Sequence, residues 1–330
     1  MASSLKSIPV LMPAPTMPLI MEGVAEAFTL HKLWEQPDEA AFIKAHGASI
    51  RAIAGGNKKR MDGAFLAQFP KLEFVSNFGV GYDGVDAVWC GKHEIIVSNT
   101  PDVLTDEVAD LAMGLLLATI RQLPQADAYL RRGEWLKGNF PLTTTLRGRT
   151  MGILALGRIG KAIASRAEAF GVKIVYHGRS QQPDVHYPYF ADLTEMARSV
   201  DILMSMAPGG AETKHLINAK VLQALGPDGI LISVGRGSVV DEKALVAALN
   251  AGTILSAGLD VFEDEPRVPA DLIAVPHVVL LPHVGSASQH TRRLMGQLVV
   301  DNLTAWFSGK GPLTPVPETP WPALGAKAKP

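Results

Sequence analysis

The sequence predicts an α/β protein in which parallel sheets carry helices on both faces. Short apolar runs alternate with amphipathic, helix-like segments along the 330 residues. Several runs are apolar at nearly every position, as strands must be when helices cover both faces of their sheet. A chain of this length is sufficient for two domains, each with its own core. We therefore expect two doubly wound parallel-sheet domains.

The expected strands follow one another along the chain. A strand and a loop occupy the proline-interrupted N-terminal stretch, which has no clean small-residue cleavage site and does not resemble a signal peptide. The later strands are expected within SIRAIAGG (49–56), LEFVSNFG (72–79), EIIVSNTP (94–101), TMGILALG (150–157), VKIVYHG (172–178), VDILMSMAP (200–208), GILISVGRG (229–237), GTILSAGLDVF (252–262) and HVVLLPHV (277–284). Strands that alternate with helices in this way indicate βαβ units and a mostly parallel sheet.

Two further segments have distinct patterns. Residues 101–123 predict one long helix, with Asp106 and Glu107 in its first part and apolar positions after them. It fits either a core helix or a helix at a subunit interface. The tail after Gly309 contains Pro312, Pro315, Pro317, Pro320 and Pro322, so we expect it to be extended and to lie over the surface.

Composition restricts the possible partners and the compartment. The formal net charge is −1 and no basic block is present, which argues against nucleic acid or an anionic membrane as a partner. Cys90 is the only cysteine, so neither a disulfide framework nor a cysteine-based metal cluster is expected, and we predict no metal site. The most apolar stretch, VADLAMGLLLATI, is too short to span a bilayer. A cytoplasmic location follows as the default.

Residues 152–164, GILALGRIGKAIA, resemble the G-x-G-x-x-G turn that binds a dinucleotide. Gly157 would let the backbone approach a pyrophosphate, and Gly160 would let the helix pack on the strand. Ala155 replaces the first glycine; alanine adopts ordinary backbone angles without strain but positive φ only at a cost. The alternative is a glycine turn that only packs a helix on a strand. The turn residues that would line the cofactor are Ala155, Leu156, Gly157, Arg158, Ile159 and Gly160.

The end of the next expected strand, residues 172–178, distinguishes an NAD site from an NADP site. An NAD site needs a carboxylate there for the ribose 2′-hydroxyl, and none occurs from Lys173 to Gln182. His177, Gly178, Arg179 and Ser180 stand in its place, and a guanidinium suits a 2′-phosphate. The sequence therefore predicts that NADPH is preferred and that NADH remains possible.

Four motifs, NFGVGYDGVD (77–86), SVGRGSVVD (233–241), AGLDVFEDEP (257–266) and LLPHVGSAS (280–288), occur in this order. Together they resemble the D-isomer-specific 2-hydroxyacid dehydrogenases, in particular the glyoxylate/hydroxypyruvate reductase branch. The resemblance extends from about Phe74 to Ser288. It implies reduction of a small 2-keto acid by hydride transfer from a nicotinamide cofactor.

The resemblance assigns roles that the chemistry of the side chains supports. Arg236 would bind and polarise the keto acid through its two-pronged donor geometry. His283 would act as the general acid, and Glu265 would hold its imidazole protonated and aimed. Each residue alone fits an ordinary surface or loop position. All three follow predicted strands, however, where open α/β sheets bind their ligands.

Further positions are implied by the resemblance alone. The backbone N–H groups of Val80 and Gly81 would bind the substrate carboxylate, and Ser286 would face the substrate. Trp135 matches an aromatic residue that reaches the neighbouring subunit's pocket in related reductases; an ordinary core or interface tryptophan is equally compatible. The other residues implied to line the cofactor are Thr105, Ala207, Pro208, Thr213, Val234, Gly235, Arg236, Asp260, which would hold the nicotinamide amide, His283 and Gly285.

The order of the motifs implies a discontinuous, flavodoxin-like substrate domain, residues 1–99 and 287–330, around a Rossmann-like dinucleotide-binding domain, residues 100–286. We expect a cleft between them, closed by a hinge, and a homodimer. Two alternatives stay open. One is a reductase of bulkier 2-keto acids, such as phenylpyruvates or 2-ketogluconate. The other is a dinucleotide-sensing binding protein that resembles the transcriptional co-repressors of this fold.

Overall fold

A computed structural model describes residues 5–56 and 60–322. The chain divides into two compact units, which we call unit 1 (Met1–Leu104 with Ser288–Pro330) and unit 2 (Thr105–Ala287). Each unit contains one sheet, and all strands paired within the two sheets run parallel. The predicted fold class, two parallel-sheet α/β domains, is confirmed.

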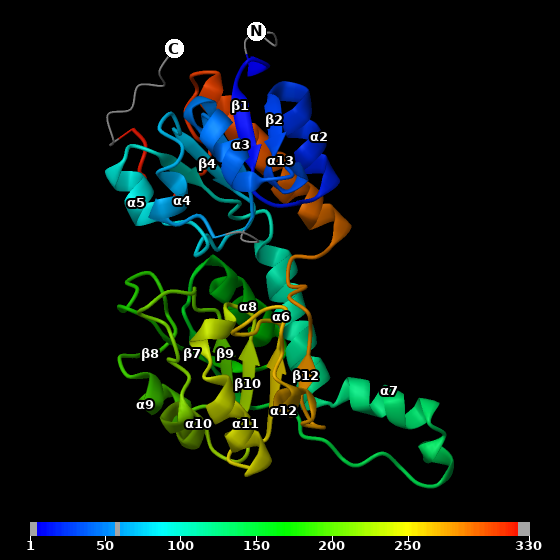
Figure 1. Cartoon of the computed structure of the whole chain (residues 1–330). Helices are drawn as coiled ribbons and strands as arrows, with labels where there is room; N and C mark the ends of the chain where they lie inside the picture. The colour runs from blue at the N-terminus through cyan, green and yellow to red at the C-terminus, as the bar shows by residue number, and fades with distance from the viewer. Residues whose placement is uncertain (1–4, 57–59, 323–330) are drawn as a thin grey trace. The chain divides into compact units, whose positions relative to one another are not determined.

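Unit 1 has a five-stranded sheet in the order β2-β1-β3-β4-β5 (Figure 1). This is the flavodoxin-like order 2-1-3-4-5. Its strands are β1 Pro9–Met12, β2 Thr29–Lys32, β3 Ala52–Gly55, β4 Phe74–Asn77 and β5 Ile96–Ser98. Its helices are α2 Pro18–Ala27, α3 Glu39–His46, α4 Gly63–Leu66, α5 Ala87–Lys92 and α13 Gln289–Phe307. Four of these five helices begin after an Asp or Ser whose side chain accepts an N–H of the first turn, which fixes where they start.

Successive side chains of a strand point to opposite faces of the sheet, so the unit 1 sheet has a hydrophobic core on each face. On β1, Val10 and Met12 belong to the cluster that includes residues of α2 and α13, whereas Leu11 belongs to the cluster with α5. Burying a side chain of this size contributes roughly 1.5–3 kcal/mol. Both faces are therefore apolar and covered, as the continuous hydrophobic runs predicted.

Unit 2 has a seven-stranded sheet in the order β12-β11-β10-β9-β6-β7-β8 (Figure 1). The chain starts in the middle at β6, runs outward to β8 and then crosses to β9, so the strand order reverses between β6 and β9. Open sheets bind ligands beyond the carboxyl ends of their strands at such a reversal. The strands are β6 Thr150–Leu154, β7 Lys173–His177, β8 Tyr189–Phe190, β9 Ile202–Ser205, β10 Ile230–Ser233, β11 Ser256–Leu259 and β12 Val279–Leu280.

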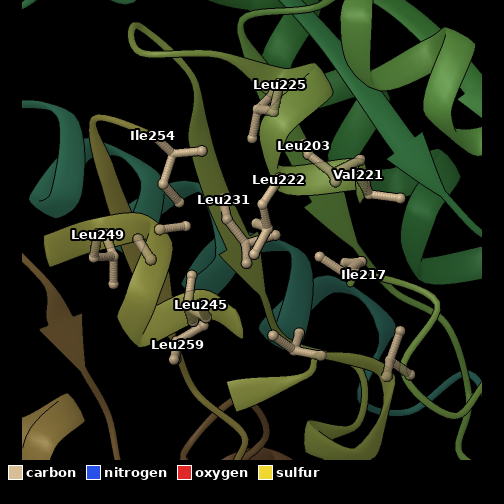
Figure 2. Close-up of a cluster of buried hydrophobic side chains, with 14 of the residues drawn as sticks. Leu203, Ile217, Val221, Leu222, Leu225, Leu231, Leu245, Leu249, Ile254 and Leu259 are labelled. Carbon is tan, nitrogen blue, oxygen red and sulfur yellow. The ribbon is translucent and has the colours of Figure 1, made fainter. Parts of the chain in front are cut away.

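Two cores cover the faces of this sheet. Figure 2 shows one of them, in which Leu203, Leu231 and Leu259 from three adjacent strands meet side chains of α10 and α11. The other contains side chains of α6 and α8. The helices of unit 2 are α6 Thr105–Ile120, α7 Leu123–Arg131, α8 Arg158–Ala169, α9 Leu193–Arg198, α10 Ala219–Leu225, α11 Glu242–Asn250 and α12 Ala270–Ile273.

The long helix expected over residues 101–123 is shorter than predicted and is followed by a second helix. α6 ends at Ile120, and Gln122 has a φ of 49°, in the left-handed region, before α7 begins. Pro124 lies in the first turn of α7, where its missing N–H costs no hydrogen bond. α6 is a core helix of unit 2, since it packs on α8 and β11. α7 extends away from the sheet of its unit (Figure 1).

The tail after Gly309 is only partly as predicted. Pro315 forms an antiparallel bridge with Ser98 of β5, and the Thr319 hydroxyl accepts the Val97 N–H at 3.0 Å. Val316 and Thr319 are buried. The prediction that this segment lies over the surface is therefore wrong for these residues, because the edge strand β5 offers backbone groups that the proline-rich segment can satisfy.

Candidate active site

The glycine turn joins β6 to α8 and has the form that a dinucleotide site requires. A Cβ on Gly160 would lie 2.8 Å from the Ala155 carbonyl oxygen, so the helix approaches the strand as closely as a glycine allows. Gly157 is the N-cap of α8, and no side chain caps the helix. A Cβ on Gly157 would meet nothing within 4 Å. The uncapped N–H groups and the open space above them fit a pyrophosphate.

Ala155 adopts the positive φ that is costly for a residue other than glycine. Its φ is 72°, in the left-handed region. Two backbone hydrogen bonds fix this conformation: Ala155 N–H donates to His177, and Gly157 N–H donates to Ala155, both at 2.9 Å. The sharp turn out of β6 thus imposes a glycine-like conformation on an alanine.

We predict that Ala155→Gly removes this strain. The free energy of unfolding should rise by up to about 1 kcal/mol, because the cost of the left-handed conformation is partly offset by the greater freedom of glycine in the unfolded chain. NADPH affinity should change less than about tenfold. Chemical denaturation and fluorescence titration measure the two quantities.

The matched control is Ala287→Gly, at a loop alanine whose φ is not positive. It should lower stability by about 0.4–1 kcal/mol. If both variants are destabilised equally, the strain at Ala155 is negligible.

The segment after β7 contains the predicted cofactor-discriminating residues. Arg179 and Ser180 are exposed, and Arg179 makes no hydrogen bond or ion pair with any residue that the structure describes. His177 is tied by Nδ1 to the Phe190 carbonyl at 2.9 Å. Gln182, which sequence reasoning missed, donates from Nε2 to the Leu156 carbonyl at 2.8 Å. It therefore fixes this segment against the glycine turn, and no motif in the sequence would have indicated it.

The other predicted cofactor residues of unit 2 follow the adjacent strands. Ala207 and Pro208 come after β9, and the Pro208 carbonyl accepts the Thr213 hydroxyl at 2.7 Å. Val234 and Gly235 come after β10, and a Cβ on Gly235 would lie 2.5 Å from the Ala207 carbonyl oxygen. Glycine is thus required where these two loops cross. Thr105 is the first residue of α6, and no contact described for it joins it to these loops.

His283 and Glu265 form a direct pair. Nδ1 of His283 lies 2.6 Å from Oε2 of Glu265, and the Phe262 N–H donates to Oε1 of Glu265 at 3.0 Å. Burial acts to raise the pKa of Glu265, but the hydrogen bonds from His283 and Phe262 and the charges of His283 and Arg236 outweigh it and lower the pKa. Glu265 is therefore ionised at neutral pH and can accept a hydrogen bond from Nδ1 of His283.

Asp260 and Arg236 complete the group. Both carboxylate oxygens of Asp260 accept backbone N–H groups of the His283 loop, from Val284 and Gly285 at 2.7 Å each. Burial raises the pKa of Asp260, and the two N–H donors oppose this shift. His283 itself has a φ of 54°, which this anchor helps to maintain. Arg236 follows β10, and its Nη1 donates to the Gly235 carbonyl at 3.0 Å.

The remaining predicted residues lie elsewhere. Val80 and Gly81 belong to a loop of unit 1 in which Asn77 donates to the Gly81 carbonyl at 3.1 Å and Asn99 donates to the Val80 carbonyl at 2.9 Å. Ser286 is half-buried beside Gly285. Trp135 lies just after α7 and is 64% exposed, so in the chain by itself it is not a core tryptophan. The two asparagines were missed by sequence reasoning.

The described part of the chain contains no cluster of three or more His, Cys, Asp or Glu side chains arranged to hold a metal ion. None of the helices within it is long and apolar enough to cross a membrane.

Arg236, Asp260, Glu265 and His283 follow β10, β11 and β12, which are neighbours in one sheet. The same sheet carries a glycine turn suited to a pyrophosphate. A cation, an aimed histidine and a dinucleotide turn at one edge of a doubly wound sheet define an oxidoreductase that uses a nicotinamide dinucleotide.

Comparison with known proteins also indicates an oxidoreductase that uses a nicotinamide dinucleotide. Residues 113–285 match the family model of the D-isomer specific 2-hydroxyacid dehydrogenase NAD binding domain. The chain is 48% identical over 312 residues to hydroxyphenylpyruvate reductase of Plectranthus scutellarioides, covering 94% of this chain and all of that protein. It is 46% identical, with the same coverage, to a glyoxylate/hydroxypyruvate reductase of Arabidopsis thaliana.

A solved structure is also similar over nearly the full length. The NADPH-dependent glyoxylate/hydroxypyruvate reductase of Sinorhizobium meliloti, in complex with NADP and malonate, is 52% identical, with a TM-score of 0.90 over 95% of this chain and 98% of that chain. The chain belongs to the D-isomer-specific 2-hydroxyacid dehydrogenase family.

Proposed function

We propose that this enzyme reduces glyoxylate to glycolate and hydroxypyruvate to D-glycerate with NADPH. The observation that carries the proposal is the 2.6 Å pair of His283 and Glu265 beside Arg236, at the sheet edge that also carries the glycine turn. The relatives named glyoxylate/hydroxypyruvate reductases, at 46% and 52% identity, support the substrate class.

The side chains would divide the chemistry among them. When bound, the reduced nicotinamide supplies the hydride that attacks the keto carbon. Arg236 binds the carboxylate and the carbonyl oxygen and stabilises the negative charge that develops on that oxygen. Glu265 accepts from Nδ1 of His283, which leaves Nε2 to donate the proton to the same oxygen. Asp260 keeps the His283 loop in place, and we propose that it also holds the nicotinamide amide.

We further propose that unit 2 binds the cofactor and that Val80 and Gly81 of unit 1 bind the substrate carboxylate through their N–H groups. Ser286 would face the substrate, and Thr105, Ala207, Pro208, Thr213, Val234, Gly235 and Gly285 would line the cofactor. We also propose a cytoplasmic location, because Cys90 is the only cysteine and no disulfide framework can form.

The preference for NADPH rests on Arg179 and Ser180. We predict that Arg179→Ala weakens NADPH binding by roughly tenfold or more and leaves NADH binding unchanged, because a hydrogen bond to a charged group contributes roughly 1.5–3 kcal/mol. Initial rates at varied concentrations of each cofactor measure the change. Arg198→Ala, at another exposed arginine of unit 2, is the control and should alter neither. Equal weakening for both cofactors would exclude a role in selecting the 2′-phosphate.

Bulkier 2-keto acids are a second candidate substrate class, because a hydroxyphenylpyruvate reductase is 48% identical to this chain. Side-by-side initial rates with glyoxylate, hydroxypyruvate and hydroxyphenylpyruvate, each with NADPH and with NADH, distinguish the two. We expect the highest kcat/KM with hydroxypyruvate and NADPH. A higher value with hydroxyphenylpyruvate would reassign the substrate, and faster turnover with NADH would overturn the cofactor preference. If both cofactors bind but no keto acid is reduced, the binding-protein alternative gains support.

We also propose a homodimer. The segment formed by α7 and the residues after it exposes Leu130, Trp135, Leu136 and Leu142, of which Leu136 is 94% exposed. A cluster of exposed apolar side chains on a projecting element is typical of a protein–protein interface. Light scattering should give the mass of two chains, and the mass of one would contradict the proposal.

A further inference from the structure

A second histidine–glutamate pair involves the same turn as Glu265. Nε2 of His215 lies 2.8 Å from Oε1 of Glu263, and both side chains are about one-third exposed, at 36% and 34%. Glu263 precedes Glu265 by two residues, so the two carboxylates bracket one short turn. The only comparable pair described elsewhere in unit 2, His186 with Glu168, is longer at 3.7 Å, and His186 is 77% exposed.

The backbone of Glu263 is held from the opposite side. Its N–H donates to Oε1 of Glu242 at 2.7 Å. Glu242 is the first residue of α11 and is only 7% exposed. Burial raises the pKa of Glu242; the Glu263 N–H opposes this shift, and the nearby charges of Glu263, Asp264 and Asp271 add to it. A buried carboxylate is unfavourable unless it is well hydrogen-bonded, so its position here fixes the Glu263 backbone.

The turn is joined to the Glu265 carboxylate by a hydrogen bond from its own backbone. Phe262 is buried, and its N–H is hydrogen-bonded to Oε1 of Glu265, whose other oxygen meets His283. A Cβ on Gly237 would overlap the Phe262 backbone, so the segment that follows Arg236 packs directly on the turn. A shift at Glu263 would therefore displace the Glu265 carboxylate from His283.

His215 also connects to the Arg236 segment. Its backbone N–H donates to the Ser238 carbonyl at 2.9 Å, and Ile217 forms a parallel bridge with Val240. His215 has a φ of 52°, a costly conformation for a residue with a side chain, which these contacts maintain. One residue thus links the segment after Arg236 to the turn that carries Glu265.

We propose that His215, Glu263 and Glu242 form a brace that aims Glu265 at His283 and holds it at a fixed place relative to Arg236. They are positioning residues, since none of them touches His283. The expected kinetic effects rest on the proposed reductase function. The placement of Glu265 against His283 is a structural property and is independent of that function.

The charged groups around His283 determine how the pH dependence of activity should change. Glu265 contacts His283, Asp260 interacts with His283 electrostatically, and the charge of Arg236 acts on Glu265. If the brace is lost, the ionised Glu265 carboxylate is less well placed to favour protonated His283. The loss of activity at high pH is then expected at a lower pH than in the wild type.

The test compares Glu263→Ala and His215→Ala with Glu263→Gln. Each alanine variant should lower kcat for hydroxypyruvate about fivefold, the equivalent of about 1 kcal/mol, and leave the NADPH dissociation constant within twofold. The high-pH loss of activity should move to lower pH. Glu263→Gln keeps an acceptor for His215 and should recover most of kcat. The double alanine variant should be no worse than either single one, because both remove the same contact.

The control His186→Ala removes a histidine–glutamate pair away from this turn and should change none of these quantities. A substrate-independent measurement separates this proposal from the proposed function. The downfield NMR signal of the His283 Nδ1 proton, assigned by its loss in His283→Gln, should move upfield in Glu263→Ala, because the hydrogen bond to Glu265 weakens. An unchanged Nδ1 proton signal, or an equal loss of kcat in Glu263→Gln and Glu263→Ala, would overturn the brace even if the enzyme reduces hydroxypyruvate.

Discussion

Replacing His283 by Gln is expected to lower kcat for hydroxypyruvate by about 10²–10⁴, the range typical of a general acid. Gln can still donate a hydrogen bond to the Glu265 carboxylate but carries no titratable proton for the substrate oxygen. NADPH binding should be retained, because the proposed phosphate contacts come from the glycine turn and from Arg179 and Ser180, which this substitution leaves in place. Stopped-flow single turnover and a fluorescence titration measure chemistry and binding separately.

Two further variants test whether the loss is specific to the His283–Glu265 pair. Glu265→Gln should cause a smaller loss, and its activity should disappear at a lower pH than in the wild type, because an ionised Glu265, whose pKa is lowered in the fold, favours protonated His283. His186→Gln, at an exposed histidine of the same unit, should leave the rate unchanged. Undiminished turnover in His283→Gln would remove His283 as the proton donor.

Replacing Arg236 by Ala is expected to lower kcat/KM by about 10²–10³, the effect of removing one donor to a developing oxyanion. Most of the loss should lie in kcat if the guanidinium stabilises charge that forms only in the transition state, and in KM if it only binds the carboxylate. The split between kcat and KM therefore distinguishes the two roles. NADPH binding again serves as the check that the variant is folded.

Arg236→Lys is the matched control, since it keeps the positive charge but loses the fork of two parallel donors. An intermediate rate is expected. If Arg236→Lys is as active as the wild type, charge alone is sufficient, and the two-pronged geometry is not needed. Activity in Arg236→Ala close to that of the wild type would exclude Arg236 from the reaction.

The sequence predicted much of the site because its signals are local. Gly157 and Gly160 lie within one strand–turn–helix unit, and the apolar runs of β6, β9 and β10 show that helices cover both faces of the sheet. The positions of Arg236, Glu265 and His283 after three predicted strands indicated that parallel strands would bring their ends to one edge. The structure shows this for the strands, and His283 and Glu265 are in contact.

Features that depend on distant backbone groups were not predictable. The break between α6 and α7 comes from one left-handed residue, Gln122, in a pattern that reads as a continuous helix. The burial of Val316 depends on an unpaired edge of β5. Glu242, at the start of a helix, resembles an ordinary exposed acidic residue in a first turn. Its burial is decided by the turn that packs over it.

The sequence by itself determined the class of fold, the family and the residue types available for chemistry, because hydrophobic periodicity and short motifs are written in adjacent residues. Only the tertiary structure decided that Ala155 takes a left-handed conformation, that Asp260 holds the His283 loop and that His215 and Glu263 brace the turn of Glu265. Each of these depends on hydrogen bonds between segments that the chain brings together only when it is folded, and such contacts leave no periodic signal in the sequence.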